Sequence, residues 1–257
     1  MEDQAAKLAA QLSMDEKLSL LTGKNFWVTQ PFPRLGIEPM EVADGPYGLR
    51  KQTGISDHMG WNKSEPAVAY VSGPGMAASW DRGLIREAGR HLGTEAKASG
   101  VDILLGPAIN IVRPPLCGRN FEYYSEDPCL TGQMAAAYIE GVQSTGVGTC
   151  IKHFAANNQE AEREYIDAVI DERTLREIYL AAFEGSLWDA SASAYILDDA
   201  QVADFSADML SSIAAVKPMS GLTQNLTRAN TRKLANNRGK GWEQAYAATV
   251  AASQLLM

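Results

Sequence analysis

Short apolar segments alternate with longer amphipathic segments through most of this 257-residue chain. Four of the apolar segments are predicted to be strands, at 39–43, 101–105, 149–154 and 193–197, and the second of them to be buried. Helical patterns lie between them, at 79–99, 130–144 and 171–187. Alternation of this kind predicts an α/β fold with a parallel sheet, either a (β/α) barrel, whole or half, or a doubly wound sheet.

The stretch 118–128, GRNFEYYSEDP, places one arginine and three carboxylates beside three aromatic residues. Arginine presents a planar fork of donors, and carboxylates accept hydrogen bonds from such a fork or from a hydroxyl. Aromatic faces next to these groups suit a sugar ring, which is apolar on its faces and polar at its edge. Arg119 could therefore bind hydroxyls; alternatively it pairs with Glu122, Glu126 or Asp127 and braces the loop.

Other polar side chains follow the first and third predicted strands. Asp44 lies in an Asp-Gly-Pro turn, where its carboxylate could accept two sugar hydroxyls or simply cap the turn. Lys152 and His153 end a strand as two cationic groups that could hold hydroxyls by charge-assisted hydrogen bonds. Trp61, in a long loop, is a candidate platform for a sugar ring. These positions follow the carboxyl ends of predicted strands, where a (β/α) barrel keeps its active site.

Composition narrows the classes of partner. The net charge is −8 and no basic tract occurs, which disfavours a nucleic-acid partner. No apolar run reaches the roughly eighteen residues of a membrane span, and the acidic N-terminus does not resemble a signal peptide. Three cysteines without CxxC spacing indicate reduced thiols in the cytoplasm. The three histidines are scattered, so we expect no metal site and no cofactor.

Six motifs occur in a recognisable order and spacing. They are DGPYGLR at 44–50, SWD at 79–81, LGPAINI at 105–111, GRNFEYYSEDP at 118–128, GVGTCIKHFAANN at 146–158 and DERTLREIY at 171–179. Together they closely resemble the N-terminal domain of family 3 glycoside hydrolases, bacterial β-glucosidases above all. The resemblance covers roughly residues 10–188.

The resemblance implies a (β/α)-barrel-like first domain and retaining hydrolysis of terminal, non-reducing β-D-glucosyl residues. It also implies a set of substrate-binding residues that hold the hydroxyls of the terminal sugar: Asp44, Arg119, Lys152 and His153. The segment NNQE at 157–160 resembles the glucosidase branch of the family.

The reacting groups of the family are not assigned by the resemblance. The family's nucleophile is the aspartate of a Ser-Asp-Trp motif, which this chain lacks, and its general acid/base lies on a second domain for which 257 residues leave no room. Retaining hydrolysis needs two carboxylates about 5 Å apart. By position alone, the candidate nucleophiles are Asp198, Asp199 and Asp204. The candidate acids are Glu122, Glu160 and Glu162.

These observations divide the chain into a (β/α) domain at 1–200 and a divergent, mostly helical tail at 201–257. A barrel cut after four strands exposes apolar sheet edges, so we expect a homo-oligomer, most simply a dimer. Two functions remain open. One is hydrolysis of a small β-glucoside or oligosaccharide by a cytoplasmic β-glucosidase. The other is sugar binding by a catalytically silent half barrel.

Overall fold

The computed structural model describes residues 8, 10–20, 23–54, 61–163 and 165–189. The chain divides into two compact units, Met1–Pro39 with Ile196–Met257, and Met40–Tyr195, which we describe separately. The predicted strand at 193–197 and the predicted tail at 201–257 lie outside the described residues.

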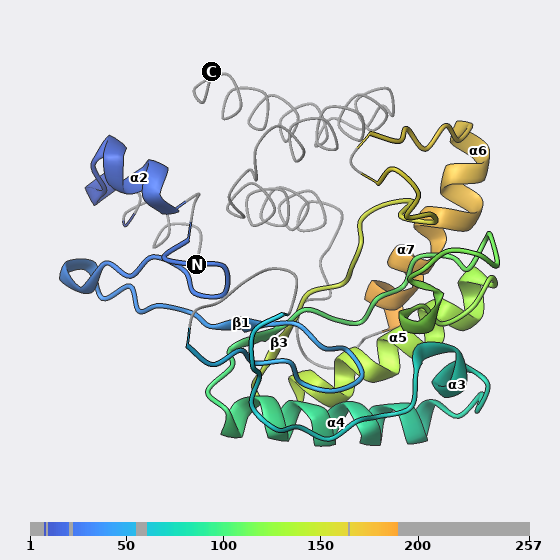
Figure 1. Cartoon of the computed structure of the whole chain (residues 1–257), viewed down its shortest axis with the longest axis horizontal. Helices are drawn as coiled ribbons and strands as arrows, with labels where there is room; N and C mark the ends of the chain where they lie inside the picture. The colour runs from blue at the N-terminus through green and yellow to red at the C-terminus, as the bar shows by residue number, and fades with distance from the viewer. Residues whose placement is uncertain (1–7, 9, 21–22, 55–60, 164, 190–257) are drawn as a thin grey trace. The chain divides into compact units, whose positions relative to one another are not determined.

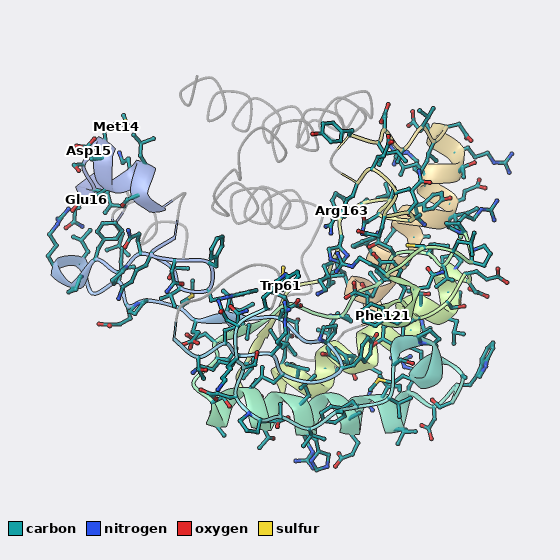
Figure 2. The ribbon with its side chains drawn as sticks, in the orientation of Figure 1. Met14, Asp15, Glu16, Trp61, Phe121 and Arg163 are labelled. Atoms are coloured by element: carbon teal, nitrogen blue, oxygen red, sulfur yellow. The ribbon has the colours of Figure 1, made fainter. Side chains whose placement is uncertain are left out.

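The first unit contains helix α2 (Met14–Leu20), which begins at a reciprocal cap. The backbone N–H of Glu16 donates to Ser13 Oγ at 3.2 Å, and the N–H of Ser13 donates to Glu16 Oε2 at 2.8 Å. Arg34, in the 3-10 turn η1 (Pro33–Leu35), donates from Nε to the same carboxylate at 3.1 Å. Asp15 and Glu16 lie in the first turn of α2 (Figure 2). Their negative charges there interact favourably with the positive end of the helix dipole.

The second unit is built on a three-stranded parallel sheet among the described residues. Its strands are β1 (Val42–Ala43), β2 (Ile103–Leu104) and β3 (Gly148–Thr149), in the order β1-β2-β3. β1 and β2 lie within their predicted segments. β3 starts one residue earlier than predicted and is shorter, but a parallel bridge between Ala108 and Lys152 extends the pairing toward the carboxyl end.

Two long helices connect these strands. Helix α4 (Arg82–Ala98) precedes β2, and helix α5 (Pro128–Gln143) precedes β3. α4 begins later than predicted because Asp81, and not Ser79, supplies the N-cap. Asp81 Oδ1 accepts from the N–H of Leu84 at 3.0 Å, while Ser79 Oγ accepts from the N–H of Asp81 at 3.2 Å.

The predicted helix at 171–187 forms as three continuous segments. They are α6 (Glu172–Thr174), the π-helical turn η3 (Leu175–Leu180) and α7 (Ala181–Asp189). Asp171 caps the start, where its Oδ1 accepts from the N–H of Thr174 at 3.0 Å. Phe154, close to β3, meets Phe183 of α7 edge-on with ring centroids 5.1 Å apart.

Helices α4 and α5 pack through their backbones. A Cβ added at Gly141 would lie 2.1 Å from the carbonyl oxygen of Arg86, and one added at Gly89 would lie 2.6 Å from that of Tyr138. Figure 1 shows the two helices next to each other on one side of the strands. This arrangement is that of consecutive units of a (β/α) barrel. The described fold is therefore α/β and resembles part of a (β/α) barrel, as predicted.

None of the described helices is long and apolar enough to cross a bilayer. The core between the sheet and its helices is apolar: Leu104 of β2, Leu92 of α4 and Val142 of α5 are at most 1% exposed. This core holds the strand ends in place.

The helix crossing yields a prediction. Gly141→Ala should destabilise the fold by about 1–3 kcal/mol, because the new methyl group would clash with backbone atoms of α4 that cannot move independently. Chemical denaturation measures the loss. Gly118→Ala is the control, since nothing lies within 4 Å of its added Cβ. Equal stability of the two variants would contradict the close crossing.

Candidate active site

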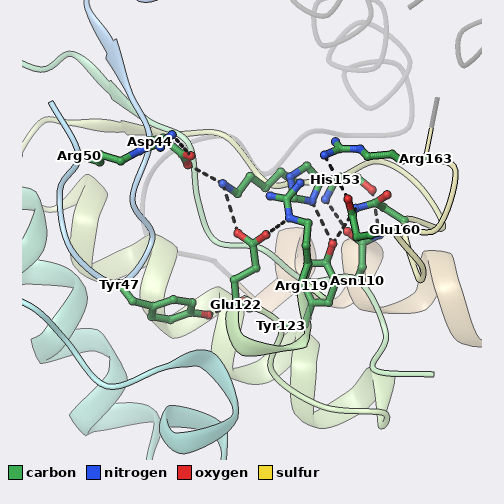
Figure 3. A network of polar contacts seen from close by, with 12 residues as sticks. Asp44, Tyr47, Arg50, Asn110, Arg119, Glu122, Tyr123, His153, Glu160 and Arg163 are labelled. Carbon is green, nitrogen blue, oxygen red and sulfur yellow. Dashed lines mark hydrogen bonds and ion pairs between the residues drawn. The ribbon is translucent and has the colours of Figure 1, made fainter. Parts of the chain in front are cut away.

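The carboxyl ends of the three strands bring the charged residues together (Figure 3). Asp44 directly follows β1, and the loop after β2 carries Arg119 and Glu122. Lys152 and His153 follow β3. Because the strands are adjacent and parallel, their carboxyl ends lie at the same edge of the sheet.

The charged side chains form a chain of alternating sign. Lys152 Nζ lies 2.6 Å from Asp44 Oδ1 and 3.5 Å from Glu122 Oε2. The other oxygen of Asp44 accepts from Arg50 Nη2 at 2.9 Å, and the other oxygen of Glu122 accepts from Arg119 Nε. The order is therefore Arg50, Asp44, Lys152, Glu122, Arg119, with three cations and two carboxylates.

The five charged side chains differ in how far they are buried, and this separates their roles. The side chain of Glu122 is only 4% exposed and that of Lys152 13%, whereas Arg119 keeps 20% and Asp44 25%. Glu122 thus acts as the internal counter-ion of two cations, while Asp44 and Arg119 retain surface that a ligand can reach. The predicted ion pair between Arg119 and Glu122 is present, and such a partner also orients an arginine for binding.

The ionised states of Asp44 and Arg119 follow from their neighbours. Burial acts to raise the pKa of Asp44, but the charge and hydrogen bond of Lys152, with help from Gly45 N–H and Arg50, outweigh it and lower the pKa. Burial acts to lower the pKa of Arg119, but the hydrogen bond and charge of Glu122 outweigh it and raise the pKa. At neutral pH the edge therefore presents a carboxylate acceptor and a guanidinium donor.

His153 is held at its backbone by a buried amide. Asn110, which is 2% exposed, accepts from the N–H of His153 at 2.7 Å and donates to its carbonyl oxygen at 2.9 Å. The imidazole Nδ1 lies 3.3 Å from the hydroxyl oxygen of Tyr123. Asn110 therefore holds the backbone of His153, and Tyr123 contacts its ring.

The imidazole of His153 is neutral. Burial and then the positive charges of Arg119, Lys152 and Arg163 lower its pKa to about 2. The expectation of two cationic groups at the end of the third strand is thus wrong for His153. The cause is that a protonated ring would add a further positive charge to a buried place beside three cations.

Three residues that contribute to this geometry were not identified as site residues from the sequence. Arg50 ends the motif DGPYGLR, Asn110 is the single polar residue within AINI, and Tyr123 lies within FEYY. An amide inside an apolar run is a usable signal, because a buried polar group needs partners. Arg50 and Tyr123 lie within motifs recognised in the sequence, but no local pattern indicated their contacts with Asp44 and His153.

Other predicted residues are placed differently. The candidate nucleophiles Asp198, Asp199 and Asp204 lie outside the described residues. Glu162 is exposed, and Glu160 is bonded to Asn157 and Arg163. Trp61 is 83% exposed (Figure 2). Among the described residues no group of three or more His, Cys, Asp and Glu side chains could hold a metal ion.

Residues 70–250 match the family model described as "Glycosyl hydrolase family 3 N terminal domain". The chain belongs to glycoside hydrolase family 3. The family match reaches past residue 188, where the recognisable motifs end. The predicted family is therefore confirmed.

Two relatives show the breadth of the family. Thermostable β-glucosidase B of Acetivibrio thermocellus is 53% identical over 181 residues, which are 70% of this chain and 24% of that protein. An exo-α-(1→6)-L-arabinopyranosidase of Bifidobacterium longum is 46% identical over 174 residues, 67% of this chain and 23% of that protein. The family 3 chain thus spans about a quarter of the length of these curated relatives.

A solved structure supports the fold. β-Glucosidase 3B of Thermotoga neapolitana, in complex with α-D-glucose, superposes with a TM-score of 0.65 and 43% sequence identity. The similarity covers 72% of this chain and 28% of that one.

The buried counter-ion yields a prediction. Glu122→Gln should cost about 3–5 kcal/mol of stability, because it removes the buried carboxylate that compensates the charge of Arg119 and takes one of two carboxylate partners from Lys152. Thermal or urea unfolding measures the loss. Glu126→Gln makes the same change at an exposed position of the same loop and should be nearly neutral. Similar stability of the two variants would contradict the assigned role of Glu122.

The neutral imidazole yields a second prediction. In the unfolded chain His153 has its ordinary pKa of 6.5, and in the folded chain a pKa of about 2. Its contribution to stability is therefore complete above pH 6.5 and falls as the pH drops, by at most about 1.4 kcal/mol per pH unit. Urea unfolding between pH 7 and pH 5 should show a shallower decline for His153→Gln than for the parent. Parallel curves would contradict the neutral state.

Proposed function

We propose that this edge of the sheet holds the terminal, non-reducing β-D-glucosyl residue of a β-glucoside, and that the protein is a β-glucosidase-type O-glycosyl hydrolase. The observation that carries the proposal is the meeting of Asp44, Arg119, Lys152 and His153 at one edge. These are the four residues that the family motifs predict to bind sugar. A glucose complex of a related structure supports the same ligand class.

The charge pattern favours a neutral, polyhydroxylated ligand. A carboxylate such as Asp44 can accept two adjacent hydroxyls, while Lys152 and Arg119 can donate to the oxygens of the same ring. Each cation already has a carboxylate partner, so the site offers little uncompensated positive charge to an anionic ligand. Sugar hydroxyls match this alternation because each is both a donor and an acceptor.

Hydrolysis requires reacting groups beyond this binding site. A retaining mechanism places two carboxylates about 5 Å apart, one as nucleophile and one as acid/base. The proposed nucleophile is Asp198, Asp199 or Asp204, by position after the fourth predicted strand. One observation favours the alternative of a silent sugar-binding protein: at the described edge, Asp44 and Glu122 are both already paired with cations.

Glucose binding and turnover of an aryl β-glucoside test the proposal. We expect glucose binding by calorimetry, weakened about ten- to hundredfold in Asp44→Asn, because charge-assisted hydrogen bonds are lost. Glu126→Gln is the surface control. One of Asp198→Asn, Asp199→Asn and Asp204→Asn should abolish turnover while glucose still binds.

The remaining outcomes separate the two functions. Glucose binding without turnover in the parent chain would favour the silent protein. Turnover that survives all three aspartate changes would remove the candidate nucleophiles. A folded parent chain that binds no glucose would contradict both functions.

A further inference from the structure

A second series of hydrogen-bonded side chains runs from the loop after His153 back to its ring. Asn157 Nδ2 lies 2.8 Å from the hydroxyl oxygen of Tyr123 and 3.0 Å from Glu160 Oε1. A side-chain amide has two N–H donors, so one nitrogen can serve both acceptors. Since a carboxylate can only accept, the NH₂ group of Asn157 must face Glu160. This contact fixes the orientation of the amide.

The amide in turn fixes the role of the Tyr123 hydroxyl. Its oxygen accepts from Asn157, which leaves its own proton for another acceptor. His153 Nδ1 lies 3.3 Å away. Tyr123 is fully buried, and burial raises the pKa of its phenol, so the hydroxyl keeps its proton. The hydroxyl is therefore arranged to donate to Nδ1.

The charges around the ring complete the argument. Arg119, Lys152 and Arg163 surround His153 with positive charge, and a neutral imidazole carries one N–H and one acceptor nitrogen. If Nδ1 accepts from Tyr123, the ring proton lies on Nε2. Figure 3 shows Tyr123 and Glu160 beside His153 within one polar network.

We propose that Tyr123 is a positioning residue that holds His153 as the Nε2–H tautomer, with Asn157 and Glu160 orienting the Tyr123 hydroxyl. The imidazole then offers a neutral N–H donor to a hydroxyl oxygen of the ligand. The role toward a sugar rests on the proposed function; the tautomer itself does not. A histidine with a purely structural role could adopt either tautomer. A histidine that donates to a ligand hydroxyl must carry its proton on Nε2, because Nδ1 faces Tyr123.

The test is the tautomer of His153, read by long-range ¹H–¹⁵N correlation on the whole chain with ¹⁵N-labelled histidine. His153→Gln assigns the resonances. In the parent chain we expect an unprotonated Nδ1 and a protonated Nε2. A protonated Nδ1 in the parent would overturn the proposal without any variant.

Two variants test the cause of the tautomer. Tyr123→Phe removes the donor to Nδ1, and Asn157→Leu frees the Tyr123 oxygen to accept from the ring, so both should increase the population protonated at Nδ1. Tyr124→Phe is the matched control, because it removes the hydroxyl of a neighbouring buried tyrosine. The ring of Tyr124 packs edge-on against that of Tyr47, with ring centroids 6.2 Å apart. The control variant should keep the parent pattern. An unchanged tautomer in both Tyr123→Phe and Asn157→Leu would overturn the proposal.

Glucose titration then separates this inference from the proposed function. Loss of the donor at Nε2 should weaken glucose binding about tenfold in Tyr123→Phe, the cost of one hydrogen bond. Tyr124→Phe should bind like the parent. If the tautomer shifts as expected in the two variants but the parent chain binds no glucose, the positioning role is supported and the proposed function is contradicted.

Discussion

The ammonium group of Lys152, held between the carboxylates of Asp44 and Glu122, is the interaction on which the candidate site depends. It joins the ends of all three described strands, because its partners follow β1 and β2 while Lys152 follows β3. A nearly buried ammonium is costly alone, and so is the nearly buried carboxylate of Glu122. Each is tolerated because the other is present, so the side chains keep one arrangement.

The same arrangement explains the different states of two neighbouring residues. Lys152 has two carboxylate partners, whereas His153 faces cations and the Tyr123 hydroxyl and stays neutral. The edge thus combines charged donors, one neutral donor and a partly exposed carboxylate acceptor. Such a mixture suits hydroxyl groups better than phosphate or carboxylate ligands, and this is the basis of the proposed sugar site.

The close packing of helices α4 and α5 is a second feature on which the fold depends. Helices α4 and α5 approach each other through glycines, so that the backbone itself forms the contact. Because α4 precedes β2 and α5 precedes β3, this contact joins the units that carry two of the three strands. The site therefore depends on packing that contains none of its residues.

Much of this could be predicted from the amino-acid sequence. Apolar periodicity indicated the strands and helices, and local motifs indicated the family and its four sugar-binding candidates, because these signals reside in short segments. The tertiary structure decided what depends on long-range contacts. Asp44 and Lys152 are 108 positions apart, and no local pattern specifies their contact. The neutral state of His153 and the role of Tyr123 likewise follow from burial and neighbouring charges, which only the folded chain brings together.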